Sequence, residues 1–211
     1  MAIAKDPLNM IICGVGGQGN ILASELVGSA AVSAGFLTTI GETYGASQRG
    51  GSVMSHVRLS KQLQYGPLIP RGEADVIVGF EPLEVLRVFR LYGNRDTHVI
   101  TNSRPNYPLG TLIGESKYPK MADMLGEIGR VAARVQVVEA TELAKQAGSA
   151  VSTNVLMVGC LVGSGLVPID LIHFEEVLKQ RFDGPALELN QKVFAMGVQS
   201  FPQVLTKPEN T

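Results

Sequence analysis

The sequence of 211 residues contains only two cysteines, Cys13 and Cys160, which lie far apart in apolar surroundings. An iron–sulfur cluster usually requires four thiolate ligands, so this chain cannot supply a complete set of ligands alone. Two isolated cysteines also do not form the disulfide framework of a small secreted protein. We therefore expect a protein of the reduced, cytoplasmic compartment.

The sequence also lacks a block of positive charge and a long apolar run. Its net charge is −1 and its Lys and Arg residues are scattered, which argues against nucleic-acid binding. The most apolar stretch, residues 155–167, contains several glycines and is too short to span a bilayer. The N-terminal residues lack the apolar run of a signal peptide. An apolar fraction of 45% with 18% charged residues indicates a globular protein that a partner partly covers.

The three histidines, His56, His98 and His173, show no metal-binding spacing. No order or motif points to a nucleophile with its base. We therefore expect neither a metal site nor a catalytic residue in this chain. His56 lies on the polar face of its predicted strand, and its role stays open.

Strand and helix patterns alternate over the first ~150 residues, which predicts a three-layer α/β fold around a mostly parallel, mixed sheet. Alternation over residues 52–60 indicates a half-exposed strand where the sheet is mixed or has an edge. The predicted strands are 10–13, 37–40, 52–60, 74–80, 98–101 and 135–139. The predicted helices are 20–34, 82–92, 119–134 and 141–147, the last with Thr141 as a plausible N-cap. Helices at 153–166, 171–182 and 186–201 complete a single domain, with an α/β core at 9–150 and a helical extension at 151–201.

A glycine-rich turn with the pattern G-x-G-x-x-G separates the first predicted strand from the first helix. Glycines allow a phosphate to approach the backbone, and the start of the helix offers unpaired N–H groups. Glu42 follows about twenty residues later, where a dinucleotide-binding fold places its ribose acid. The turn has three interpretations: a nicotinamide or flavin site, a site for another phosphate, or a tight turn used only for packing. The candidate ligand-binding residues are Gly14, Gly16, Gly17, Gln18 and Gly19.

Residues 41–51 form a second glycine-rich stretch, which we interpret as a long polar loop. Loops at the ends of parallel strands are where α/β proteins place ligand and partner contacts. Arg49 is the candidate anion-binding residue there, because a guanidinium binds carboxylates and phosphates bidentately. The alternative is a solvated loop with Arg49 paired to a local acid.

The chain resembles a known family along nearly its whole length, residues 9–201. The glycine turn, followed by Ala23 and by residues 41–45, 48–53 and 55–58, is similar to the gamma-type domain of the pyruvate/2-oxoacid:ferredoxin oxidoreductases. Later segments look like the beta subunits of the indolepyruvate:ferredoxin oxidoreductases. These segments are residues 68–70, 72–75, 80–84, 102–105 and 140–144, with Asn154.

The resemblance implies a small subunit of a multisubunit enzyme. Such an enzyme converts an aryl 2-oxoacid, coenzyme A and oxidised ferredoxin into an aryl-acetyl-CoA, carbon dioxide and reduced ferredoxin. In this family thiamine diphosphate with Mg²⁺ and the 4Fe-4S clusters lie in a large partner subunit. The present sequence agrees, because it has neither a Gly-Asp-Gly stretch with a later Asn-Asn pair nor a cysteine cluster. The resemblance also implies that this domain helps to hold coenzyme A. The remaining alternatives are a stand-alone NAD(P)-dependent dehydrogenase and a purely structural scaffold.

Overall fold

The computed structural model describes residues 5–45, 51–107, 109–115 and 117–201. Within this part of the chain, six strands form one sheet in the order β2-β3-β1-β4-β5-β6. Strands β1, β4, β5 and β6 are mutually parallel, whereas β3 runs antiparallel to both β1 and β2. The strands are β1 (Leu8–Val15), β2 (Leu37–Tyr44), β3 (Ser52–Ser60), β4 (Val76–Gly79), β5 (His98–Asn102) and β6 (Arg134–Val138).

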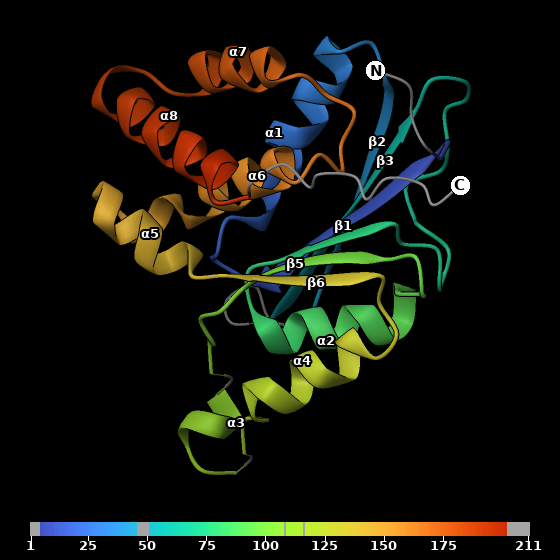
Figure 1. Cartoon of the computed structure of the whole chain (residues 1–211), viewed down its shortest axis with the longest axis vertical. Helices are drawn as coiled ribbons and strands as arrows, with labels where there is room; N and C mark the ends of the chain where they lie inside the picture. Colours follow the sequence, from blue (N-terminus) through green and yellow to red (C-terminus); the bar gives the residue numbers. More distant parts are fainter. Residues whose placement is uncertain (1–4, 46–50, 108, 116, 202–211) are drawn as a thin grey trace, which may run out of the picture.

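Helices cover both faces of this sheet (Figure 1). One face carries α1 (Asn20–Ser33), α5 (Ala140–Ala147), α6 (Thr153–Gly163), α7 (Leu171–Arg181) and α8 (Gly184–Gln199), while α2 (Pro82–Tyr92) and α4 (Met121–Gly129) cover the other. Two short helices, α3 (Leu109–Leu112) and η1 (Ala150–Ser152), lie in connecting segments. The predicted three-layer α/β fold with a mixed sheet and C-terminal helices is therefore confirmed.

The C-terminal helices share one hydrophobic core with the sheet. Leu156 of α6 and Phe194 of α8 belong to the same buried cluster as Met10 and Ile12 of β1. Helices α6 and α8 approach so closely that a Cβ atom on Gly197 would lie 2.2 Å from the carbonyl oxygen of Leu156. In the described part of the chain, no helix is both long enough and apolar enough to cross a membrane.

Strand β3 differs from its predicted surroundings. It lies inside the sheet between β1 and β2, and His56 and Ser60 on its expected polar face are both buried. The segment after β3 and helix α2 cover this face: the backbone N–H of Ile69 donates to Nδ1 of His56, and the Tyr92 ring stands edge-on to the imidazole. The prediction of a half-exposed strand is therefore wrong, because the polar side chains His56 and Ser60 are buried in the protein interior and do not face solvent.

Several predicted boundaries also change. Strand β2 continues to Tyr44, so the first residues of the predicted polar loop are paired with β3. Helix α4 is shorter than predicted. Glu139, not Thr141, is the N-cap residue of α5, and Thr141 contacts Asn102 instead.

Candidate functional site

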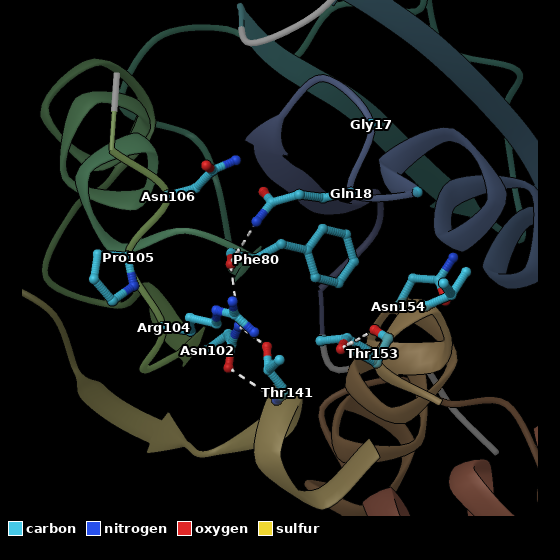
Figure 2. A pocket seen from close by; sticks show the side chains of 13 residues that line it. Gly17, Gln18, Phe80, Asn102, Arg104, Pro105, Asn106, Thr141, Thr153 and Asn154 are labelled. Atoms are coloured by element: carbon cyan, nitrogen blue, oxygen red, sulfur yellow. Dashed lines mark hydrogen bonds between the residues drawn. The ribbon is translucent and has the colours of Figure 1, made fainter. Parts of the chain in front are cut away.

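The parallel strands β1, β4, β5 and β6 end at one edge of the sheet, and the segments that follow them surround a cavity of about 410 Å³. We call it the glycine-loop cavity. Its walls come from the turn after β1, the ends of β4 and β5, the start of α5, and the η1–α6 junction (Figure 2). The lining residues are Gly17, Gln18, Gly19, Phe80, Asn102, Arg104, Pro105, Asn106, Thr141, Ala150, Val151, Thr153 and Asn154.

The Gln18 side chain holds the glycine turn in place through two hydrogen bonds to the backbone. Its Oε1 accepts the Val15 N–H at 2.8 Å, and its Nε2 donates to the Phe80 carbonyl at 3.3 Å. Gly17 and Gly19 have φ angles of 101° and 83°, a region that favours glycine. A Cβ on Gly17 would meet no atom within 4 Å, so its backbone is open to an approaching ligand.

Three helices begin at this cavity, although the Asn102 Oδ1 already accepts the Thr141 N–H of α5 at 3.4 Å and the Asn154 Oδ1 accepts the Val155 N–H of α6 at 2.8 Å. Gly19 at the start of α1, Glu139 at the start of α5 and Ser152 at the start of α6 provide no side-chain cap. The first N–H groups of a helix lack intrahelical acceptors and carry a partial positive charge. Residues from all three helix starts line the cavity, so the cavity is suited to an anion.

A chain of hydrogen bonds connects the strand ends beneath the cavity. The Phe80 carbonyl, at the end of β4, accepts hydrogen bonds from the Gln18 and Asn102 amides. The Asn102 amide also donates to Thr141 Oγ1 at 2.9 Å, which links β5 to α5 (Figure 2). Asn102 and Thr141 are buried and Gln18 is partly buried, so the bonds fix the relative position of the loops that form the walls.

Arg104 provides the positive charge of the site. It lies two residues after the end of β5, is exposed, and lines the cavity together with Asn102 and Thr141 (Figure 2). Among the described residues, no carboxylate lies within salt-bridge distance of its guanidinium. Arg104 is also the only ionisable residue among those that line the cavity. The arrangement is therefore suited to anions and hydrogen-bonding groups, and the described residues that line it contain no acid–base pair.

The remaining sequence candidates lie elsewhere. Gly14 is beneath the turn, where a Cβ would collide with the side chains of Gln18 and Asn20. Gly16 donates its N–H to the Gly51 carbonyl at 2.8 Å, so that group is already used. Arg49 lies outside the described residues.

Glu42 does not line the cavity, and its position differs from that of a ribose-binding acid. It lies within β2, which β3 separates from β1, whereas a dinucleotide-binding fold pairs these strands directly. Burial and the neighbouring Glu25 raise the pKa of the Glu42 carboxyl, and its side chain accepts a hydrogen bond from Tyr44. The expectation that Glu42 follows the end of its strand is wrong, because the strand continues past it.

A second cavity, of about 620 Å³, lies on the other side of the glycine turn. We call it the Tyr44 cavity; it shares Gly17 and Gly19 with the first cavity and is also lined by Gly16, Asn20, Ile21, Tyr44 and Val53. Tyr44 and Ile21 are partly exposed there. The glycine turn therefore separates the glycine-loop cavity, which is the more polar of the two, from the more apolar Tyr44 cavity.

Neither cysteine nor His56 belongs to either cavity. Burial raises the pKa of Cys13 far above its usual range and that of Cys160 to about 12, so both are inert thiols at neutral pH. Burial lowers the pKa of His56, which is a neutral core residue. Within residues 5–45, 51–107, 109–115 and 117–201, no group of three or more His, Cys, Asp or Glu side chains could hold a metal ion.

Solved structures share this fold. The gamma subunit of a keto/oxoacid ferredoxin oxidoreductase from Geobacter sulfurreducens matches with a TM-score of 0.64 at 20% identity, over 90% of this chain and 96% of that chain. The 2-oxoglutarate:ferredoxin oxidoreductase of Magnetococcus marinus, solved with 2-oxoglutarate, coenzyme A and succinyl-CoA bound, matches with a TM-score of 0.72 at 22% identity. That match covers 92% of this chain and 30% of the larger one.

Sequence comparison identifies relatives at higher identity. Indolepyruvate oxidoreductase subunit IorB of Archaeoglobus fulgidus is 40% identical over 190 residues, which cover 90% of this chain and 93% of the relative. The subunit of the same name from Pyrococcus horikoshii is 37% identical over 202 residues, 93% of this chain and 97% of the relative. The family model described as pyruvate ferredoxin/flavodoxin oxidoreductase matches residues 9–200. The predicted resemblance is confirmed, and the chain, an oxidoreductase subunit, belongs to the pyruvate ferredoxin/flavodoxin oxidoreductase family.

Proposed function

We propose that this chain is the small subunit of an indolepyruvate-type 2-oxoacid:ferredoxin oxidoreductase, and that its glycine-loop cavity binds the phosphates of coenzyme A. The names of the relatives at 37–40% identity support the substrate class. The coenzyme A role rests on one observation: three helix starts surround a single cavity together with Arg104, which has no carboxylate within salt-bridge distance among the described residues. The related 2-oxoglutarate enzyme solved with coenzyme A bound supports the same assignment.

Each wall of the cavity has a distinct part in this proposal. The Arg104 guanidinium would bind phosphate oxygens through two parallel hydrogen bonds. The N–H groups at the start of α1 would receive a second phosphate, since Gly17 leaves the backbone open. Thr153 and Asn154, on the opposite side from Arg104 in Figure 2, would bind further polar groups of the ligand.

The chemistry of decarboxylation and electron transfer belongs to the partner in this proposal. A large catalytic subunit would hold thiamine diphosphate with Mg²⁺ and the 4Fe-4S clusters, and ferredoxin would dock on the complex. We place the complex in the cytoplasm, in line with two cysteines that remain free thiols. The small subunit then binds and orients the acyl acceptor without taking part in proton transfer.

A stand-alone NAD(P)-dependent dehydrogenase is disfavoured by the position of Glu42, which β3 separates from the glycine turn. A purely structural scaffold predicts different mutant behaviour. Under that alternative, a change in the cavity alters assembly and leaves coenzyme A kinetics normal in the complex that remains.

Arg104→Ala in the assembled enzyme tests the coenzyme A role. Loss of a hydrogen bond to a charged group is worth about 1.5–3 kcal/mol, so the apparent constant for coenzyme A should rise roughly ten- to hundredfold. The matched control is Arg95→Ala, because Arg95 is exposed and precedes β5 at the opposite end of that strand. Equal constants for coenzyme A in wild type and Arg104→Ala would refute the proposed site.

A further inference from the structure

Glu81 is a buried carboxylate whose two oxygens bind different parts of the chain. It follows Phe80 at the end of β4, is 1% exposed, and is the N-cap residue of α2. Its Oε2 accepts the Glu84 N–H at 2.8 Å. Its Oε1 accepts the Asn106 N–H at 3.4 Å and the Tyr118 hydroxyl. One side chain therefore joins the start of a helix to a distant segment.

That segment is the long connection between β5 and α4, which carries Arg104 to the glycine-loop cavity. The Ser103 N–H donates to the Val138 carbonyl at 2.8 Å, so the connection is held to β6 where it begins. Glu81 holds it again at Asn106 and near its far end at Tyr118. Arg104 thus lies between two fixed points, Ser103 and Asn106.

We propose that Glu81, assisted by Tyr118, is a positioning residue that holds Arg104 at the glycine-loop cavity and so sets the affinity for coenzyme A. This inference rests on the proposed function of the cavity. Glu81 itself does not line the cavity, so its effect passes through the backbone of residues 103–106.

A positioning role explains why a carboxylate is buried at Glu81. Removing a carboxylate from water costs free energy, and burial accordingly raises the pKa of Glu81, although its three hydrogen bonds oppose the rise. Arg87, on the same helix, pairs with Glu84. An N-cap role alone would use one oxygen and is performed better by a shorter side chain such as Asp. The longer side chain and its second oxygen are needed only to reach Asn106 and Tyr118.

Two variants separate positioning from simple helix capping. Glu81→Asp keeps a carboxylate at the N-cap but shortens its reach, and Tyr118→Phe removes one donor from Oε1. Tyr107→Phe is the matched control, because the Tyr107 ring packs edge-on against Tyr118 in the same segment and is about half exposed. All are measured in the complete enzyme, with thermal melting of each complex to verify its fold.

We expect Glu81→Asp and Tyr118→Phe to raise the apparent KM for coenzyme A about three- to tenfold, the size of one lost hydrogen bond. The kcat at saturating coenzyme A should be unchanged, because the ligand still reaches the same cavity. Tyr107→Phe should match wild type in both constants. An unchanged KM in Glu81→Asp would mean that Glu81 only caps α2 and would overturn the inference.

The double variant Tyr118→Phe with Arg104→Ala decides whether the effect passes through Arg104. If Tyr118 acts by holding that segment, it adds nothing once the guanidinium is gone, and the double variant matches Arg104→Ala alone. If the increases in KM for coenzyme A caused by the two single changes instead multiply in the double variant, the inference is overturned while the proposed function stays intact. An unaffected KM in Arg104→Ala would instead overturn the proposed function, so the two failures are distinguishable.

Discussion

Alanine at Gly17 and alanine at Gly19 should damage the protein in different ways, although both glycines lie in one turn. Both have positive φ angles, 101° and 83°. A left-handed backbone costs a residue with a Cβ about 1–2 kcal/mol, and this loss is common to the two variants. Any difference between them therefore reports their surroundings.

Those surroundings are opposite. A Cβ on Gly19 would lie 2.2 Å from Nδ2 of Asn154, a buried side chain whose Oδ1 accepts the Val155 N–H at 2.8 Å. Moving that amide sacrifices a hydrogen bond worth about 0.5–1.5 kcal/mol. Gly19→Ala should therefore lower the free energy of unfolding by about 1.5–3.5 kcal/mol, and Gly17→Ala by only about 1–2 kcal/mol.

For ligand binding we expect the opposite order, with Gly17→Ala more damaging than Gly19→Ala. The methyl group of Gly17→Ala would enter open space beside both cavities, where a phosphate would otherwise approach the backbone. We expect the apparent constant for coenzyme A to rise about tenfold, a loss of about 1.4 kcal/mol. Urea unfolding measures the stability difference, and initial rates of the assembled enzyme measure the constant. A Gly17→Ala variant less stable than Gly19→Ala, with normal coenzyme A kinetics, would refute the reasoning.

Two further predictions concern the helices and the cysteines. Gly197→Ala should lower the melting temperature, since its Cβ would press on the α6 backbone at a cost of about 1–3 kcal/mol. Gly126→Ala is the control: this residue is exposed on α4 and its Cβ would meet no atom within 4 Å, so the change should raise stability by about 0.5–1 kcal/mol. Equal shifts in melting temperature would contradict the close packing of α6 and α8. The chain produced anaerobically without its large subunit should contain only substoichiometric iron, because both cysteines are buried and far apart in sequence, and stoichiometric iron in a metal analysis would contradict this.

The sequence was sufficient to predict the element types and the site of the glycine turn, because each depends on local patterns. The sheet order was not predictable in this way. Whether residues 52–60 lie at an edge or between β1 and β2 depends on pairing between segments far apart in the chain, and the alternating pattern cannot specify the partner. The pairing partner of β2 was likewise not predictable, and it disfavours the interpretation of Glu42 as a ribose-binding acid.

The candidate site was only partly visible in the sequence. Gly17, Gln18 and Gly19 line the cavity as expected of a glycine turn between a strand and a helix. Arg104 was not identified as a ligand-binding candidate, although it belongs to the family-like segment 102–105, because a single arginine in a proline-rich segment matches no ligand-binding motif. Glu81 belongs to the family-like segment 80–84, but the sequence does not indicate its role, since that role depends on contacts with Asn106 and Tyr118 that only the fold creates.

Strand β3, which runs antiparallel to β1, distinguishes the surroundings of this glycine turn from those in dinucleotide-binding folds. In those folds the strand beside β1 runs parallel to it and brings an acid to the ribose. Here β3 presents its N-terminal end to the turn, with Ser52 opposite Val15, and the Gly51 carbonyl takes the Gly16 N–H. Among the described residues on that side of the turn, no acid occupies the position of a ribose-binding acid, and the Gly16 N–H, a donor that could serve a phosphate, is already occupied. Among the described residues that line the glycine-loop cavity, the charged one follows β5, so under the proposed function we expect ligand selectivity to depend on Arg104 and the buried contacts that position it.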